Sequence, residues 1–299
     1  MIKPSFLIVG APKSGTTSMA QYLGAHPDIF MAKGEPRFFG TDIPCGRPRL
    51  SESEYLSLFS TAVDKPCRGE KSPVYLHSKL AAAEIHRFNP ETKILIMLRN
   101  PIDMVYSLHG QLAFKSFRED ILDFGEALNA EEDRRCGKRL PRKNWHPGVL
   151  FYSTIARYTE QIARYQLHFP AEQIHIVIFD DFISDTAAEY AKTLRFLGVA
   201  DDFRPEFKIY NPAISYRFVF WRKHLLPLSN AVKKLANRTL PGLAGMAARM
   251  PQLRGIMHRK QTRRPPMQRV DRERLNKIYT NEIRSLEHLL KRDLERWLA

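Results

Sequence analysis

The chain has 299 residues, which is long enough for one large or two ordinary domains. A hydrophobic content of 43% excludes global disorder, and no apolar run reaches the roughly 18 residues of a transmembrane helix. The net charge of +15 indicates an anionic partner. Because the first residues enter a strand-like run at once and the three cysteines are widely spaced, we expect no signal peptide and a cytoplasmic location.

Short apolar runs alternate with helical stretches along the chain. Apolar runs cover residues 6–9, 93–98 and 174–179. Helical spacing covers the stretch from Thr16 to just before Pro27 and residues 79–88, 149–168 and 271–297, whereas residues 118–147 are charged and are expected to be irregular. The alternation predicts an α/β fold with a central parallel sheet flanked by helices, in a single domain over residues 1–299.

A phosphate-binding loop is predicted between the first apolar run and the first helix, in residues 10–17 (GAPKSGTT). Its glycines, among them Gly15, let the backbone turn tightly so that N–H groups and the helix N-terminus face an anion. Lys13 adds a positive charge, and three hydroxyl side chains add hydrogen-bond donors. These hydroxyls belong to Ser14, Thr16 and Thr17.

The main competing interpretation of this loop is a magnesium nucleotide site. In P-loop kinases and hydrolases the lysine directly follows the second glycine, whereas Lys13 precedes Gly15 by two residues. Asp180 and Asp181 follow the third apolar run and would offer a magnesium ligand or a helix N-cap. We favour a site that requires no metal and a structural role for Asp180 and Asp103, with an ATP-dependent small-molecule kinase as the alternative.

The loop resembles the 5'-phosphosulfate loop of sulfotransferases that use 3'-phosphoadenosine-5'-phosphosulfate (PAPS). Residues 98–101 (LRNP), followed by Tyr106 and Ser107, resemble the 3'-phosphate motif of that family. The resemblance implies that Arg99 and Ser107 hold the 3'-phosphate, and an arginine offers a planar fork of donors for phosphate oxygens. It also implies a fold like that of P-loop nucleotide hydrolases, PAPS as co-substrate and a hydroxyl acceptor.

Two further segments resemble glycan sulfotransferases of the heparan sulfate type. Residues 35–39 (EPRFF) are similar to the segment that carries their general base, and residues 70–75 (EKSPVY) are similar to a second conserved segment of theirs. The resemblance implies Glu35 as general base. From their positive charges we expect Lys13 to neutralise the leaving phosphate and Lys71 to stabilise the sulfo group in flight, with a solvated turn residue next to Pro73 as the alternative for Lys71. The alternative for Glu35 is an ion pair with Arg37, which stands where many members have histidine, or with Lys33.

The positive charge is concentrated in residues 207–270, a basic lid or insertion. This stretch has fourteen Lys and Arg and no Asp or Glu, so the rest of the chain carries a net charge of only +1. Residues 260–266 (KQTRRPP) resemble the loop that closes over the 3'-phosphate, which implies cofactor contacts for Arg263 and Arg264.

Three roles for the basic stretch stay open. It is a lid that raises the affinity for PAPS, a peripheral contact with anionic lipid, or a binding surface for an acidic glycan. No nucleic-acid module accompanies it, so we expect no nucleic-acid partner. A non-catalytic protein that binds anions or membranes is a further alternative. The acceptor is a lipid or amphiphile, a glycan or a small metabolite, and the sequence does not indicate an oligomeric state.

Other candidates rest on position alone. Residues 145–148 (WHPG) either line an acceptor pocket or form a turn. His109 is expected on a helix surface, and His26 and His77 are given no role.

Overall fold

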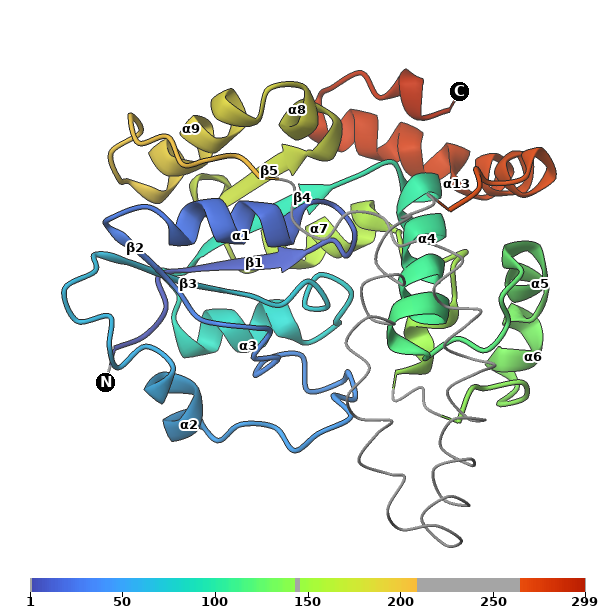
Figure 1. Ribbon diagram of the computed structural model, residues 1–299, viewed down its shortest axis with the longest axis horizontal. Helices are drawn as coiled ribbons and strands as arrows, with labels where there is room; N and C mark the ends of the chain where they lie inside the picture. Colours follow the sequence, from blue (N-terminus) through green and yellow to red (C-terminus); the bar gives the residue numbers. More distant parts are fainter. Residues whose placement is uncertain (1, 143–145, 209–263, 299) are drawn as a thin grey trace, which may run out of the picture.

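The structure is a computed structural model that describes residues 2–142, 146–208 and 264–298. In this part of the chain, five parallel strands form one central sheet (Figure 1). Their order across the sheet is β2 (Ile29–Met31), β3 (Cys67–Lys71), β1 (Phe6–Gly10), β4 (Lys93–Leu98) and β5 (Ile174–Ile178). The predicted α/β class and parallel sheet are confirmed.

Helices cover both faces of this sheet, and the strands alternate their side chains between the two layers. Phe6 and Ile8 of β1 face one hydrophobic cluster, whereas Leu7 and Val9 face the other. Burial on both faces explains why β1 and β4 read as continuous apolar runs. The first cluster includes residues of α1 (Thr16–Gly24) and α9 (Thr186–Leu197), and the second includes residues of α3 (Ala81–Phe88), α4 (Pro101–Gly110), α7 (Tyr158–Gln166) and α13 (Arg269–Leu290).

Three of the expected elements differ from the prediction. The expected helix over residues 149–168 is wrong, because a 3-10 turn (Pro147–Leu150) and an irregular stretch precede α7. Ser153 in that stretch donates its backbone N–H to the Glu131 carboxylate at 3.0 Å, which competes with a helical hydrogen bond. The segment 118–147 is more regular than expected, since it contains α5 (Phe124–Asn129) and α6 (Glu131–Arg135).

A buried ion pair holds this excursion in place. Arg134 donates to Glu119 at 2.7 and 2.9 Å, and both side chains are inaccessible to solvent.

The C-terminal region also departs from one long helix. After α13 the chain turns at Lys291, with a φ of 50°, and ends in a short 3-10 helix (Glu295–Trp297). Among the described helices, none is long and apolar enough to span a bilayer.

The carboxyl ends of the parallel strands meet at one edge of the sheet, where open α/β sheets bind their ligands. β1, β4 and β5 each lead there into the start of a helix, namely α1, α4 and α8 (Phe179–Ser184). Asn100 caps α4 by accepting from the N–H of Ile102, and its amide donates to the Trp297 carbonyl at 3.0 Å. A π-helix (Gln111–Ser116) extends α4, whereas α2 (Glu52–Ser57) lies in the connection between β2 and β3.

Candidate active site

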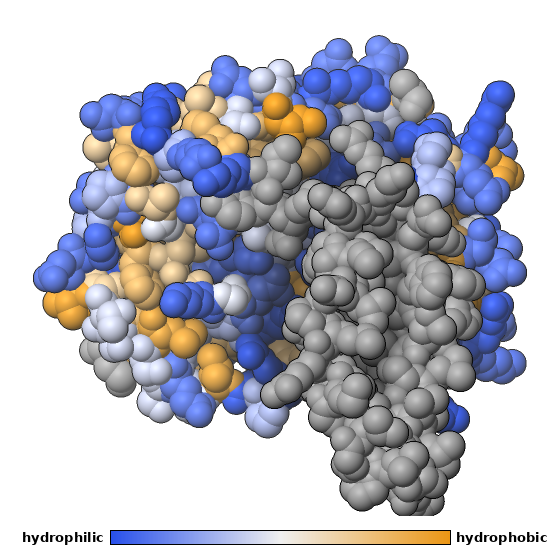
Figure 2. Space-filling model, viewed as in Figure 1, coloured by the Kyte–Doolittle hydropathy of each residue, from blue (hydrophilic) through white to orange (hydrophobic). Residues whose placement is uncertain are grey.

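A cavity of about 720 Å³ opens at the carboxyl edge of the sheet. It is lined by the loop after β1, the end of β3, Arg99, the α4 helix with its π-helical extension, and α8. Figure 2 shows hydrophilic residues gathered in the central part of this face of the molecule. Among the described residues that line the cavity, six are Lys or Arg and one is a carboxylate. They are Lys13, Arg37, Lys71, Arg99, Lys115, Arg118 and Glu35.

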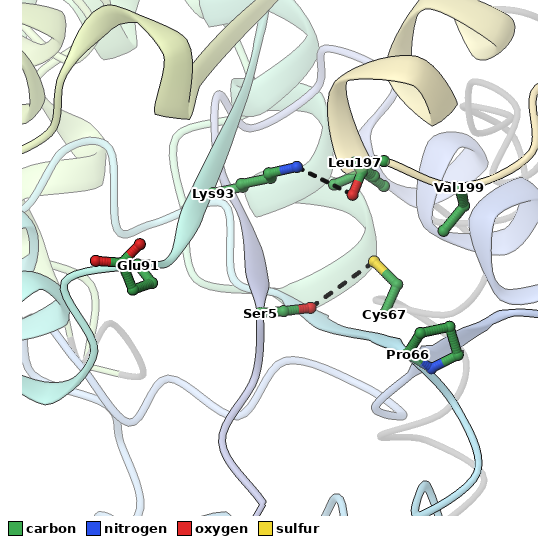
Figure 3. A pocket seen from close by; sticks show the side chains of 8 residues that line it. Ser5, Pro66, Cys67, Glu91, Lys93, Leu197 and Val199 are labelled. Carbon is green, nitrogen blue, oxygen red and sulfur yellow. Dashed lines mark hydrogen bonds between the residues drawn. The ribbon is translucent and has the colours of Figure 1, made fainter.

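A smaller hollow of about 200 Å³ includes the first residue of β3 and of β4, at the other ends of the strands (Figure 3). Its lysine, Lys93, donates to the carbonyls of Phe196 and Leu197 at 2.7 and 3.0 Å, which satisfies the C-terminus of α9. Ser5 contacts the Cys67 sulfur at 3.7 Å. Because its cation already caps a helix, we do not assign the active site to this hollow.

The loop of residues 10–17 folds as an anion cradle at the start of α1. Lys13 and Gly15 both adopt left-handed backbone conformations, with φ of 63° and 85°, and α1 begins at Thr16. The φ of Gly15 favours glycine, and a Cβ there would also crowd the Phe179 ring at 3.1 Å. The N-terminus of α1 thus adds its N–H groups to the cavity wall.

The loop side chains divide between cavity and interior. Lys13, Gly15, Thr16 and Thr17 line the cavity. Ser14 does not: its side chain is fully buried and its hydroxyl contacts the Pro12 carbonyl at 3.4 Å.

Lys13 is half-buried in a positively charged environment. Its pKa is lowered from 10.5 to about 8, first by burial and then by the charges of Lys115, Arg99 and Lys71. A bound anion would offset the repulsion among these cations. The electrostatics of the loop therefore favour a phosphate or sulfate ligand.

Arg99 and Ser107 form the second basic and hydroxyl-bearing part of the same cavity. Arg99 directly follows β4, where its guanidinium stacks 4.9 Å over the Phe179 ring and lies 3.4 Å from the Lys13 carbonyl. Ser107 lies on α4. The structure therefore brings the predicted 3'-phosphate pair to the cavity that contains the first loop.

Arg264 is placed differently from the other predicted cofactor contacts. Its guanidinium stacks 3.5 Å over the Tyr106 ring on α4 and lies 2.7 Å from His109 Nδ1. It is not among the residues that line the cavity. Arg263 lies outside the described residues, as does most of the basic stretch 207–270.

Glu35 lies between two cations. Its carboxylate accepts from Arg37 at 2.6 Å and from Lys71 at 2.9 Å, and Lys71 also lies 3.4 Å from the Thr17 hydroxyl. Burial raises the pKa of Glu35, but the Lys71 charge and the hydrogen bonds from Arg37 and Lys71 outweigh it, so the pKa lies below its usual value. The ion pair with Arg37, which was the alternative to a role as base, is present in the same geometry that sets Glu35 on the cavity wall.

Lys115 and Arg118 are cavity residues that the sequence reasoning missed. Lys115 lies in the π-helical extension of α4, and at Phe117 the chain takes a left-handed turn with a φ of 53°. A basic residue eight positions after Ser107, two turns along a helix, was the available signal for Lys115. No signal indicated the turn that brings Arg118 back toward the cavity.

The histidines have mainly structural positions. His146 lines the cavity, which was one of the two roles left open for residues 145–148, and Trp145 lies outside the described residues. The surface position expected for His109 is wrong: it is fully buried and bonds the Ile121 carbonyl at 2.9 Å. His26 bonds the Ala200 carbonyl at 2.9 Å. Burial lowers the pKa of both His77 and His146 to about 4, and their rings lie 5.6 Å apart.

The two aspartates expected to be structural both hold elements together. Asp180 accepts from the Trp297 indole at 2.6 Å, and Asp103 accepts from Arg272 at 2.7 Å. Asp180 is not an N-cap, because α8 begins one residue earlier, at Phe179. Within the part of the chain that the structure describes, no cluster of His, Cys, Asp and Glu has the arrangement of a metal site.

The parallel sheet, the loop of residues 10–17 and the Arg99–Ser107 pair together define an α/β protein with a basic cavity suited to an anionic ligand at the carboxyl edge of its sheet. Residues 3–208 match the family model described as the sulfotransferase domain, and the chain belongs to that family. Human heparan sulfate glucosamine 3-O-sulfotransferase 3B1 is 26% identical over 200 residues, which are 66% of this chain and 46% of that protein.

Human heparan sulfate glucosamine 3-O-sulfotransferase 6 is 28% identical over 201 residues, covering 66% of this chain and 52% of the relative. The chain thus spans about half the length of these curated relatives. The crystal structure of a sulfotransferase from Alicyclobacillus acidocaldarius is 26% identical and superposes with a TM-score of 0.73 over 100% of both chains. The predicted family and P-loop-like architecture are confirmed.

Proposed function

We propose that this protein transfers the sulfo group of PAPS to a hydroxyl of an acceptor molecule. The observation that carries the proposal is the convergence of eight predicted residues on one cavity. They are Lys13, Gly15, Thr16, Thr17, Glu35, Lys71, Arg99 and Ser107. The loop of residues 10–17 and the Arg99–Ser107 pair fit the two phosphate-bearing ends of PAPS. The cavity volume of about 720 Å³ lies in the range of sites for small molecules.

Three residues of the cavity have separate roles in the proposed reaction. A bond forms between the acceptor oxygen and sulfur while the bond from sulfur to the 5'-phosphate oxygen breaks. The hydroxyl proton goes to the Glu35 carboxylate, which could contribute roughly 10²–10⁴-fold to the rate. The leaving phosphate keeps the electron pair and departs as adenosine 3',5'-bisphosphate beside Lys13, while Lys71 balances charge on the sulfo group.

The class of acceptor and the setting of the reaction belong to the same proposal. Lipids or amphiphiles, glycans and small metabolites all carry suitable hydroxyls, and the basic stretch 207–270 would favour an anionic one or an anionic membrane surface. A cytoplasmic reaction is consistent with three free cysteines, since thiols stay reduced there. Sedimentation with anionic vesicles at low salt tests membrane contact, and no co-sedimentation would reject it.

Calorimetric titration separates this proposal from its alternatives. We expect adenosine 3',5'-bisphosphate to bind without metal and more tightly than ATP with Mg²⁺. Tighter binding of ATP with Mg²⁺ would support a small-molecule kinase, and binding of neither would support a non-catalytic protein. Incubation of ³⁵S-labelled PAPS with host-cell extract then identifies the labelled acceptor.

The assignment of the base has its own test. Glu35→Gln should bind the bisphosphate like the wild type yet lose turnover by at least about 100-fold. Glu273→Gln on α13 is the matched control, because this exposed carboxylate pairs with Arg269 on the same helix and does not line the cavity. Near-normal turnover of Glu35→Gln would reject Glu35 as the base.

A further inference from the structure

A buried carboxyl group, Glu70, is the sequence neighbour of the lysine that pairs with the candidate base. Glu70 precedes Lys71 at the end of β3, and adjacent strand residues point to opposite faces. Lys71 reaches Glu35 on the cavity wall, whereas the Glu70 side chain is fully buried and does not line the cavity. Burial raises its pKa to about 7 despite hydrogen bonds from Tyr75 and Ser72.

Such a group costs stability at neutral pH, because an ionised carboxylate without a cationic partner is expensive to bury. Its presence therefore calls for a role that apolar residues of similar volume would not supply.

The hydroxyls around Glu70 hold the segment that carries Glu35. Ser72 donates to Glu70 Oε2 at 2.9 Å and accepts from the backbone N–H of Arg37 at 3.1 Å. The Tyr75 hydroxyl accepts from the next two N–H groups, at 2.8 Å from Phe38 and 3.3 Å from Phe39. The backbone N–H groups of three consecutive loop residues are thus held by the hydroxyls of Ser72 and Tyr75, which follow the end of β3.

The backbone at Arg37 needs this support. Arg37 has a φ of 54°, a left-handed conformation that costs energy for a residue other than glycine. On the other side of the chain, Arg49 donates to the carbonyls of residues 37–39, at 2.9, 3.2 and 3.0 Å. The loop is therefore held through both its N–H and its carbonyl groups, and Glu35 lies two residues before the supported turn.

We propose that Glu70 is a positioning residue for sulfo transfer: through Ser72 it fixes the backbone of Arg37 and thereby the Glu35 carboxylate against the acceptor. The proposal rests on the proposed role of Glu35 as the base. Glu70 itself touches no reacting atom. Its hydrogen bond orients the Ser72 hydroxyl so that the oxygen lone pair faces the Arg37 N–H.

The test compares two replacements of similar volume. Glu70→Met removes the hydrogen-bond acceptor, whereas Glu70→Gln keeps a carbonyl oxygen that can accept from Ser72. With ³⁵S-labelled PAPS and host-cell extract as the acceptor pool, we expect Glu70→Met to lower the apparent kcat at least about tenfold, since small misplacements of reacting groups are costly. The KM for PAPS and the Kd for adenosine 3',5'-bisphosphate should stay within about twofold, and Glu70→Gln should recover most of the rate.

Two further variants separate positioning from general stability. Ser72→Ala should reproduce the kcat loss, and the Glu70→Met/Ser72→Ala double variant should be no slower, because both act through one hydrogen-bonded chain. Glu131→Gln is the control, since Glu131 is also buried, has a raised pKa and accepts from the Ser153 N–H, yet does not line the cavity. It should leave kcat unchanged.

Several outcomes would overturn the proposal. These are a Glu70→Met kcat within twofold of the wild type, equal losses in Glu70→Met and Glu70→Gln, or a kcat loss accompanied by an equal loss of bisphosphate affinity. If Glu35→Gln is inactive while Glu70→Met is normal, only the positioning role fails. If Glu35→Gln is active, the proposed base fails first.

Discussion

Binding of the nucleotide should be coupled to protonation of Lys13. Burial, and then the charges of Lys115, Arg99 and Lys71, place the pKa of Lys13 at about 8 in the free protein. A 5'-phosphate beside the ammonium group would favour its charged form and return the pKa toward 10.5. Above pH 8 the free protein loses this proton whereas the complex keeps it, so binding takes up a proton and affinity falls as pH rises.

The size of this coupling follows from the two pKa values. At pH 9 Lys13 would be about 10% protonated in the free protein and about 97% protonated in a complex with a restored pKa, so about 0.9 proton is taken up per nucleotide bound. The affinity would fall about tenfold per pH unit between pH 8 and 10.5, to a limit of about 300-fold.

Calorimetry measures the proton uptake directly. Adenosine 3',5'-bisphosphate is titrated at pH 9 in two buffers of different ionisation enthalpy, a pH at which its phosphates are fully ionised because their second pKa is about 6. Lys13→Met should bind more weakly and show no proton uptake. An uptake below about 0.3 proton in the wild type, or the same uptake in Lys13→Met, would refute the coupling through Lys13.

Three other predictions follow from particular contacts. Gly15→Ala should lower the free energy of unfolding by about 1–3 kcal/mol and the bisphosphate affinity at least tenfold. Gly137→Ala, with a similar φ but open space around it, should keep the affinity. Equal affinities of the two variants would contradict the packing argument. Lys71→Met should move the acid limb of the pH–kcat/KM profile to higher pH, because it removes the largest influence that lowers the pKa of Glu35; an unmoved limb would contradict this. Asp180→Ala should destabilise by about 1–3 kcal/mol in denaturant unfolding without loss of turnover, whereas a metal ligand would lose turnover.

The sequence predicted those strands whose composition is dictated by burial. β1, β4 and β5 read as apolar runs because helices cover both faces of the sheet. β3 (CRGEK) was not predicted, because its polar residues break the apolar pattern expected of a buried strand. Arg68 donates to the Lys65 carbonyl at 2.5 Å and Glu70 accepts from Ser72, both close in sequence, whereas Lys71 pairs with the distant Glu35. The local sequence pattern carries no information about the Lys71–Glu35 pair.

The same distinction applies to the site. Lys13 and Arg99 could be placed together from the sequence, since each follows a strand and parallel strands end at one edge. The burial of Ser14 could not, because it depends on how the loop turns through the left-handed residues on either side. Arg118 was missed for a related reason: a π-helix and the turn at Phe117 determine its direction, and neither has a reliable sequence pattern.

The arrangement around Glu35 is compatible with both an ion pair and the proposed role as general base. In the structure Lys71 lies 2.9 Å from Glu35 and 3.4 Å from the Thr17 hydroxyl of the nucleotide loop, so it is shared between the base and the anion site. A sulfo group bound beside that loop would compete with Glu35 for the Lys71 ammonium. Because burial raises the pKa of Glu35 and Lys71 is the largest influence opposing it, any weakening of their ion pair makes Glu35 more basic. With Glu35 as the proposed base, the ion pair would keep the carboxylate ionised before a sulfo donor binds, and its weakening on binding would increase the strength of the base when the acceptor must lose its proton.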